Sequence, residues 1–277
     1  MAAEVPKIEL RDVWKVFELD GRSVVALGGV TISAGRAEFV SLIGPSGCGK
    51  STIFNVVAGL LEPTSGDVLV DGHRPPSRLG LVGYMPQKDL LLPWRTILDN
   101  VVLGLEIRGV DRDTACREAL RHFPAFGLQG FEHRYPAALS GGMRQRAAFL
   151  RTLLLGKDAL LLDEPFGALD ALTRAEMQEW LLRIWESYRP TVLFITHDVD
   201  EAILLSDRVY VLTERPAAVR REVRVPLPRP RRYDVVTTPE FTALKAELLT
   251  ALRKLPGPAR AGGRRDSAVP ALVDADR

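Results

Sequence analysis

The chain contains little cysteine and no long hydrophobic run, and each shortage excludes a class of protein. Only two of its 277 residues are cysteines, Cys48 and Cys116, which is too few for a disulfide framework and is typical of a reducing compartment. No uninterrupted apolar run approaches the roughly 18 residues that a membrane-spanning helix needs. The opening residues, MAAEVPKIELRDVW, lack the apolar core and the basic start of a secretory signal. We therefore expect a soluble protein in the cytoplasm.

Aromatic side chains are scarce in the basic C-terminal part of the chain, where binding of nucleic acid would need them. Residues 1–212 carry 23 Lys or Arg against 27 Asp or Glu, whereas residues 213–277 carry 14 against 8. The basic stretch has almost no interleaved aromatics and the body of the chain is acidic, so we expect no nucleic-acid partner. The basic C-terminal part is interpreted as a solvated surface or as a weak attraction to anionic lipid.

Short apolar runs that end in polar residues recur along the chain. The runs at residues 39–43, 159–162 and 191–195 are typical of strands that are buried on both faces. Helical patterns separate them, which predicts an α/β fold with a largely parallel sheet. The polar residues after these strands then share one edge of the sheet, where open α/β sheets bind their ligands.

The clearest helical pattern is TRAEMQEWLLRIWESY, at residues 173–188. Thr173 and Glu176 form a predicted capping box at its start. An apolar stripe then follows at helical spacing, and we interpret it as core packing. Its members are Met177, Leu181, Ile184, Trp185 and Tyr188.

The main domain is predicted to span residues 1–225. Helical periodicity without a convincing strand indicates a helical subdomain at residues 88–156, inserted between core parts 1–87 and 157–225. After this domain the sequence PLPRPRRY has too many prolines for a central strand.

Two further segments complete the predicted organisation. Residues 226–255 are expected to form a short C-terminal extension with one helix. Residues 256–277 are rich in Gly, Pro, Ala and Arg, which predicts a disordered tail.

Residues 44–51, GPSGCGKS, match the pattern G-x-x-x-x-G-K-[ST] between a predicted strand and a predicted helix, the context that a P-loop requires. Its glycines let backbone N–H groups curve around a phosphate, and the following helix N-terminus adds its positive end. Lys50 is expected to reach the β- and γ-phosphates, and the Ser51 hydroxyl to bind Mg²⁺. The alternative is a glycine-rich turn with an incidental lysine. The residues predicted to bind nucleotide here are Gly44, Pro45, Ser46, Gly47, Cys48, Gly49, Lys50, Ser51 and Thr52.

Two adjacent carboxylates, Asp163 and Glu164, end the predicted strand that begins at residue 159. An aspartate there is suited to hold Mg²⁺. The adjacent glutamate is placed to orient or deprotonate a water molecule, which favours hydrolysis over transfer to an acceptor. His197 follows another strand on the same edge and is interpreted as a contact for the γ-phosphate. The alternatives are a solvated strand end and a structural histidine.

A second phosphate-binding pattern lies in LSGGMRQR, residues 139–146. Ser140 is a good N-cap, and Gly141 and Gly142 leave the first N–H groups of the following helix uncovered. Such a helix end binds anions. One P-loop and a second anion-binding end make sense if each chain donates that end to the ATP of a neighbouring copy.

Taken in order, these motifs resemble those of the nucleotide-binding subunits of ATP-binding cassette (ABC) transporters. The resemblance covers about residues 7–252 and rests on the P-loop, YMPQ, LSGGMRQR, LLLDEP, GALD and ITHD. It implies the P-loop NTPase (RecA-like) type of α/β fold, with a parallel sheet, an antiparallel β subdomain at the N-terminal side and an inserted α-helical subdomain. It also implies ATP and Mg²⁺ as cofactors, and a homodimer when ATP is bound.

The resemblance implies further roles around the first phosphate site. Gln87 would sense Mg²⁺ and the attacking water, with Ser51 and Asp163 as the other residues near the metal. Glu164 resembles the catalytic base and His197 the residue that holds the γ-phosphate and water.

Other roles concern the dimer and the base of the nucleotide. Ser140, Gly141 and Gly142 would contact the γ-phosphate of the ATP held by the other protomer. Asp170, in GALD, resembles an aspartate that communicates across the dimer. Phe17 lies where this family often has an aromatic residue that stacks on adenine, although it could equally be a core residue.

The apolar cluster Leu90 to Trp94, within the stretch LLPWRT that comes after Gln87, belongs to no catalytic motif. An exposed apolar cluster marks a partner site. The resemblance implies that Leu90–Thr96 contacts an integral-membrane permease. The alternative is that the cluster folds back into the helical insert. LLPWRT is especially similar to importers of the nitrate, sulfonate and taurine type, and relatives that carry vitamin precursors look alike here.

The function implied is an ATPase that drives a bacterial importer of a small solute from the cytoplasmic face of the membrane. An extracytoplasmic solute-binding protein would be an indirect partner. The rival hypothesis is a soluble ABC ATPase of a cofactor-assembly or other non-transport complex. The sequence does not name the solute, because the subunit need never touch it.

Overall fold

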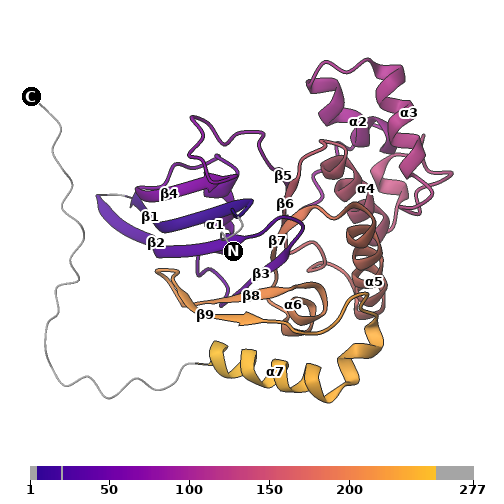
Figure 1. Ribbon diagram of the computed structural model, residues 1–277. Coiled ribbons are helices and arrows are strands. Elements are labelled where there is room, and N and C mark those ends of the chain that lie inside the picture. Colours follow the sequence, from indigo (N-terminus) through magenta and orange to yellow (C-terminus); the bar gives the residue numbers. More distant parts are fainter. Residues whose placement is uncertain (1–4, 20, 254–277) are drawn as a thin grey trace, which may run out of the picture.

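The computed structural model describes residues 5–19 and 21–253, and these contain two sheets with helices around them (Figure 1). A three-stranded antiparallel sheet has the order β2-β1-β4, and a six-stranded sheet has the order β5-β6-β7-β3-β8-β9. Its first five strands are parallel, and β9 is antiparallel to β8. The strands are β1 (Ile8–Leu19), β2 (Arg22–Ala34), β3 (Phe39–Ile43), β4 (Ser65–Val70), β5 (Gly83–Met85), β6 (Ala159–Asp163), β7 (Thr191–Ile195), β8 (Arg208–Leu212) and β9 (Val219–Arg224).

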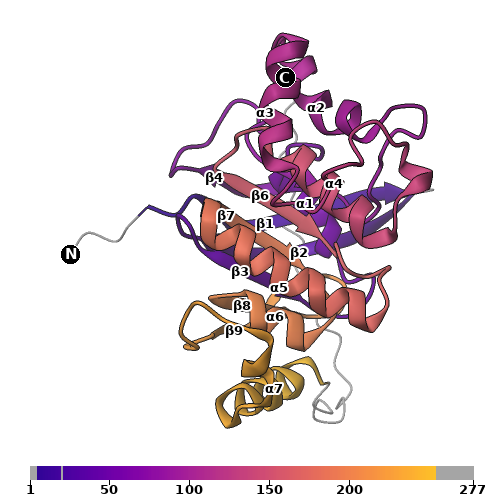
Figure 2. The same cartoon turned by 90° about the vertical axis from the view of Figure 1, so that its right-hand side faces the viewer.

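Helices lie on both faces of the large sheet and form a separate group beyond its β5 edge. The helices are α1 (Lys50–Val57), α2 (Ile97–Ile107), α3 (Arg112–His122), α4 (Gly141–Leu153), α5 (Ala171–Tyr188), α6 (Val199–Leu205) and α7 (Pro239–Leu252), with short 3₁₀ helices at Pro136–Ala138 and Tyr233–Thr237. Figure 2 shows α5 lying along the sheet, with α6 and α7 below it. The predicted α/β architecture, including the antiparallel sheet formed near the N-terminus, is confirmed.

The central strands are buried on both faces, as their continuous apolar runs predict. In β3, Val40 and Leu42 pack into a core shared with α1 and the antiparallel sheet. Phe39 and Ile43, on the opposite face, join a core built with α5, α6 and the helical group. Alternate residues of β3 therefore pack into two different cores, one on each face of the same sheet.

The register of the parallel strands brings their carboxyl ends level with one another. Leu42 of β3 pairs with Ile195 of β7, and Asp163 of β6 also pairs with Ile195. Met85 of β5 pairs with Leu162. Residues located just after β5, β6, β7 and β3 consequently gather at one edge of the sheet.

The part of the chain predicted to be helical forms a compact group. In the described structure, residues 97–153 contain α2, α3, a 3₁₀ turn and α4, and none of them is in a strand. This group projects beyond β5 at the upper right of Figure 1. The packing of α2 against both α3 and α4 holds it together.

The start of α5 differs from its prediction. Asp170 is the N-cap, and its side chain accepts a hydrogen bond from the backbone N–H of Thr173 at 3.0 Å. The capping box assigned to Thr173 and Glu176 is therefore wrong, because an aspartate three residues earlier already caps the helix. The apolar stripe is confirmed as core except at its end, where the exposed Tyr188 donates to or accepts from His122.

The C-terminal extension packs on the core through its helix and through one buried arginine. Phe241 and Leu248 of α7 are buried. Arg231 is 5% exposed, and its guanidinium donates to the carbonyl oxygens of Ile203 at 3.0 Å and Ser206 at 2.6 Å, at the end of α6. Further bonds reach Leu204, Val225 and Leu227. Burial lowers the pKa of Arg231 to about 10, so it stays charged at neutral pH.

Replacing Arg231 with methionine is expected to lower the free energy of unfolding by about 3 kcal/mol, because several buried carbonyl groups lose their donor together. Urea unfolding would measure the change. Arg232→Met is the matched control, since Arg232 is exposed. Equal stability of the two variants would contradict this role.

Within residues 5–19 and 21–253, the helices are too short or too polar to span a bilayer. The predicted disordered tail, residues 256–277, lies outside the residues that the structure describes.

Candidate functional site

The P-loop joins the end of β3 to the start of α1. Lys50, the first residue of α1, is 7% exposed, and its ammonium donates to the carbonyl oxygens of Gly44 at 2.9 Å and Pro45 at 3.1 Å. These bonds hold the loop curved around the lysine. The loop therefore presents backbone N–H groups and a positive charge to the same space.

Two residues of the loop explain its composition. Gly49 has φ +127°, and a Cβ there would lie 3.0 Å from the Ala26 carbonyl oxygen, so a larger residue would be strained and crowded. Cys48 is buried in the core with its thiol away from solvent. Its expected contribution to phosphate binding is thus limited to its backbone.

A cleft of about 390 Å³ lies over this loop and brings together residues from distant parts of the chain. Such a volume suits a small ligand. It is lined by Ser46, Gly47, Gly49, Lys50, Ser51, Thr52, Gln87, Glu164 and Arg215.

Glu164 is the meeting point of the segments that come after β5, β6 and β7. Its Oε2 accepts a hydrogen bond from Nε2 of Gln87 at 3.1 Å and lies 3.6 Å from Nδ1 of His197. The level strand ends produce this convergence. Gln87 and Glu164 line the cleft, and His197 lies beside Glu164.

The backbone at Glu164 is in a conformation that non-glycine residues rarely adopt, with φ +44°. Its N–H donates to the Ile195 carbonyl oxygen at 3.0 Å, and its own carbonyl accepts from the N–H of Gly167 at 3.1 Å. Strained backbone that is held by neighbouring strands is characteristic of sites where a side chain must be aimed.

Asp163 lies deeper, at 5% exposed, and Tyr84 of β5 donates its hydroxyl to Oδ2 at 3.4 Å. Burial raises the pKa of Asp163, while the Ser51 hydroxyl, Tyr84 and Lys50 oppose that rise. Burial and the Asp163 charge raise the pKa of Tyr84 to about 12, so it remains a donor. Tyr84 was not predicted, because a tyrosine within a strand carries no signal of a polar contact.

The donor set fits Mg²⁺ held together with a phosphate. The Ser51 hydroxyl and the Asp163 carboxylate adjoin each other, and oxygen donors are the ligands that Mg²⁺ prefers. Among residues 5–19 and 21–253, no group of three or more His, Cys, Asp or Glu side chains forms a protein-only metal site. A magnesium ion here would complete its shell with phosphate and water.

A buried polar network lies behind His197. Glu201 of α6 accepts from the Thr196 hydroxyl at 2.5 Å and from the Gln178 amide at 3.1 Å, and burial raises its pKa. Arg174 of α5 donates to the Leu169 carbonyl at 3.0 Å and lies 3.8 Å from Asp198. The segments before Asp170 and around His197 are thereby joined, a connection that sequence reasoning missed.

The second predicted phosphate site lies apart from the first. Ser140 caps α4 by accepting from the Met143 N–H at 3.3 Å, as predicted. A Cβ at Gly141 would lie 3.3 Å from Leu169, and one at Gly142 would lie 3.1 Å from Thr173. This helix start therefore adjoins the segment of Asp170, and neither belongs to the described lining of the P-loop cleft.

Phe17 is half-buried on β1, and the Lys15 ammonium lies 5.2 Å from its ring centroid. It belongs to neither buried core cluster of the described chain. Its stacking on adenine stays a prediction.

The apolar cluster after Gln87 is divided between interior and surface. Leu91 is buried in the core of the helical group, whereas Leu90 is 58% and Trp94 is 72% exposed. Leu91 thus folds back into the helical insert, whereas Leu90 and Trp94 do not, and the permease contact stays a prediction. Arg144 and Arg151 of α4 secure its start, through the Asp89 carboxylate at 3.2 Å and the Leu90 carbonyl at 2.8 Å respectively.

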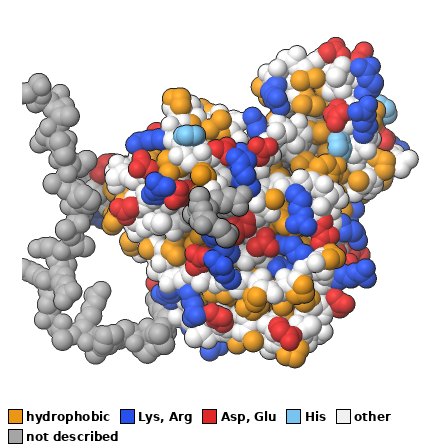
Figure 3. Space-filling view, in the orientation of Figure 1, with side chains coloured by type: hydrophobic (Ala, Val, Ile, Leu, Met, Phe, Trp, Pro, Cys, Tyr) orange, Lys and Arg blue, Asp and Glu red, His pale blue; other side chains and the backbone are white. Residues whose placement is uncertain are grey.

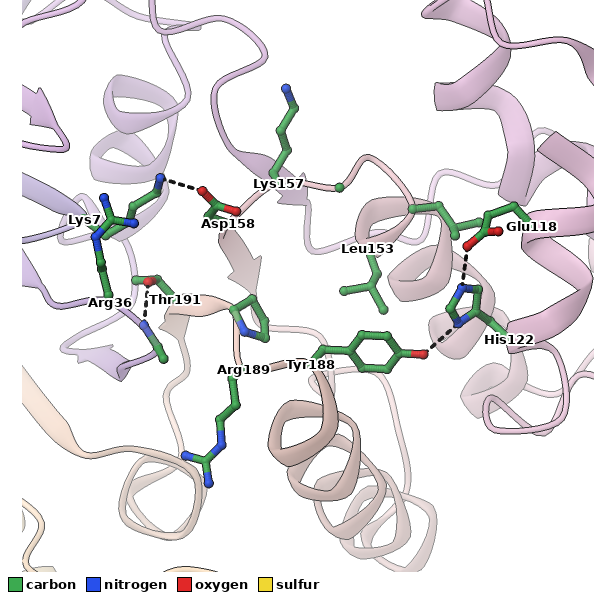
Figure 4. Close-up of a pocket in the computed structure, with 14 residues that line it drawn as sticks. Lys7, Arg36, Glu118, His122, Leu153, Lys157, Asp158, Tyr188, Arg189 and Thr191 are labelled. Carbon is green, nitrogen blue, oxygen red and sulfur yellow. Dashed lines mark hydrogen bonds and ion pairs between the residues drawn. The ribbon is translucent and has the colours of Figure 1, made fainter. Parts of the chain in front are cut away.

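A larger cleft, of about 580 Å³, lies at the opposite edge of the sheet, near the amino ends of β3, β6 and β7 (Figure 4). Lys7 is paired there with Asp158 at 3.0 Å, and His122 lies 2.7 Å from the Tyr188 hydroxyl and 3.4 Å from Glu118. Its size exceeds that of the P-loop cleft, but it has no phosphate-binding loop. The smaller cleft is therefore the candidate site.

Charges of both signs are interspersed over the face shown in Figure 3. That face offers no continuous basic stripe of the kind that tracks a nucleic-acid backbone.

Comparison with known proteins gives consistent matches. A family model described as ABC transporter matches residues 27–167. The formylaminopyrimidine import ATP-binding protein ThiZ of Halalkalibacterium halodurans is 46% identical over 79% of this chain and 84% of its own. The nitrate import ATP-binding protein NrtD of Synechococcus elongatus is 44% identical over 87% of this chain and 89% of its own. A solved dimeric bacterial ABC transporter cassette is 31% identical with a TM-score of 0.69, covering 79% of this chain and 98% of that one.

Proposed function

Because this chain belongs to the ABC transporter family of ATP-binding proteins, we propose that it is the ATP-hydrolysing subunit of an importer for a small solute. The observation that carries this proposal is the convergence of Gln87 and His197 on Glu164, beside the P-loop cleft. The imported solutes named for its relatives, formylaminopyrimidine and nitrate, define the size class that we infer.

In the proposed mechanism, each residue acts on the γ-phosphate or on the attacking water. Lys50 and the loop N–H groups bind the phosphates and offset their charge. Glu164 orients the water and accepts its proton, and His197 holds the water and the phosphate in line. Mg²⁺, held by Ser51, Asp163 and Gln87, would neutralise charge on the phosphates. The hydrogen bond from Gln87 Nε2 to Glu164 Oε2 supports a joint action of the two side chains on the attacking water.

We propose further that two copies close around ATP. The start of α4 exposes Ser140 and lies apart from the P-loop cleft of its own chain, so a second copy is needed to bring Ser140, Gly141 and Gly142 to that cleft. Asp170 lies beside this helix start and would meet the other protomer with it. The dimeric cassette of similar fold supports this arrangement.

The segment Leu90–Thr96 is the proposed contact with an integral-membrane permease, which would hold the subunit at the cytoplasmic face of the membrane. The exposed Leu90 and Trp94 provide an apolar surface, and Arg144 and Arg151 connect it to the helix that begins just after Ser140. A change at the second phosphate site can thus reach the permease contact through one helix. The helical subdomain 88–156, set within residues 1–225, would be the moving part.

The test is purification of the tagged protein from gently solubilised native membranes. We expect a multi-span permease to co-purify, and Trp94→Ala to weaken that association by about 30-fold, the effect of losing an interface hot spot of about 2 kcal/mol. The ATPase rate of the isolated variant should stay within about two-fold of the parent rate, since Trp94 does not line the cleft.

Leu249→Ala, on α7, is the matched control for loss of an exposed apolar side chain. A soluble assembly protein in place of the permease would favour the rival hypothesis, a soluble ABC ATPase of a cofactor-assembly or other non-transport complex. Loss of folding in Trp94→Ala would instead show that Trp94 is a packing residue.

A further inference from the structure

A second cation besides Lys50 lines the nucleotide cleft, and it comes from no motif in the sequence. Arg215 lies in the turn between β8 and β9, and its Nη2 donates to the carbonyl oxygen of Gly47, in the P-loop, at 3.1 Å. The same cleft contains Lys50 and Glu164. Arg215 therefore reaches the phosphate-binding loop from a part of the chain far away in sequence.

The turn that carries Arg215 is firmly anchored. The Ala217 N–H donates to the Ala26 carbonyl at 2.9 Å, and the Gly28 N–H donates to the Ala217 carbonyl at 2.8 Å, which ties the turn to β2. Within the turn, Thr213 donates its hydroxyl to the Pro216 carbonyl at 3.0 Å. Arg215 is thus held at the rim of the cleft by a fixed backbone.

The guanidinium retains capacity to bind an anion. A carbonyl oxygen carries no net charge, so the bond to Gly47 leaves the positive charge of Arg215 in place. Arginine has five N–H donors in a planar fork that matches phosphate oxygens. Its side chain is exposed, so it can shift toward a ligand at small cost.

We propose that Arg215 binds the polyphosphate of the nucleotide as a second cation, in the cleft that Glu164 also lines. This inference rests on the proposed nucleotide site. Arg215 raises the affinity for ATP through its charge.

The experiment separates the charge of Arg215 from its hydrogen bond to Gly47. Arg215→Gln keeps a donor but removes the charge, whereas Arg215→Lys keeps the charge. Calorimetry with MgATP should give about 10-fold weaker binding for Arg215→Gln and a loss of no more than about three-fold for Arg215→Lys.

Arg220→Gln is the matched control. Arg220 is an exposed arginine of β9 that donates to the Ala251 carbonyl and does not line the cleft. It should bind MgATP as the parent protein does. Raising the salt concentration should weaken binding more steeply in the parent than in Arg215→Gln, because screening acts on the charge that the variant lacks.

Unchanged binding in Arg215→Gln would overturn the proposal. So would equal weakening in both Arg215 variants with the salt dependence of the parent, because Arg215 would then act only by holding Gly47. Lys50→Ala distinguishes this failure from that of the site itself. If Lys50→Ala binds ATP more weakly and Arg215→Gln binds it normally, only the proposed role of Arg215 is wrong. If both variants bind ATP normally, the assignment of the nucleotide site is wrong.

Discussion

Replacing Glu164 with glutamine is expected to slow ATP hydrolysis by about 10²- to 10⁴-fold while ATP still binds, which is the range that a general base contributes. Glutamine has the same shape but cannot accept the proton of the attacking water. Lys50 and the P-loop backbone, which bind the phosphates, are unchanged by this substitution. We expect the variant to accumulate as an ATP-bound dimer, because the step that releases the two copies is blocked.

Two measurements on purified protein check this result. Release of phosphate gives the rate, and analytical ultracentrifugation with and without MgATP gives the dimer. Glu176→Gln, which removes an exposed carboxylate from α5, is the matched control and should hydrolyse ATP normally. A normal rate in Glu164→Gln would mean that Glu164 is not the base, and His197 would become the residue to examine.

Replacing Lys50 with alanine is expected to weaken ATP binding by about 100-fold or more and to abolish measurable turnover. The Lys50 ammonium is held within the P-loop by the carbonyl oxygens of Gly44 and Pro45. A charge-assisted contact with phosphate contributes about 1.5–3 kcal/mol. Because one ammonium would contact two phosphates, we expect a loss of binding free energy at the upper end of this range.

Calorimetry with MgATP would measure the loss, and thermal unfolding would show whether the loop has collapsed. Lys50→Met retains most of the buried stem without the charge and should bind ATP as poorly as Lys50→Ala. Lys157→Ala, in the cleft at the opposite edge of the sheet, is the matched control (Figure 4). Near-normal turnover in Lys50→Ala would contradict the P-loop assignment.

The features that sequence predicted correctly are local. The apolar run at β3, followed at once by glycines and Lys50, contains strand, turn and helix within a few residues. Asp163 and Glu164 likewise lie directly at the end of their own strand. Buried strands in parallel order make the meeting of such strand ends at one edge a necessity of the fold.

The features that escaped prediction depend on partners far along the chain. Tyr84 and Arg215 reach the site only because β5 pairs with β6 and because the β8–β9 turn is tied to β2. The start of α5 was misplaced because Asp170 and Thr173 are both good caps, and neighbouring residues decide between them. Leu90 and Leu91 are identical residues side by side in the sequence, so the sequence alone does not distinguish them. Packing leaves Leu90 exposed and buries Leu91.

The bonds from Arg231 to the end of α6 have a consequence for how such chains can be recombined. Arg231 of the extension is hydrogen-bonded to the end of α6, and α6 begins two residues after His197. The extension therefore helps to fix the position of the segment that carries this histidine. An extension grafted from a relative would need its own arginine and a matching set of carbonyl groups to be accepted. A chimera joined at Val225 that lacks this match should misplace His197 and lose ATPase activity, although every nucleotide motif would be intact.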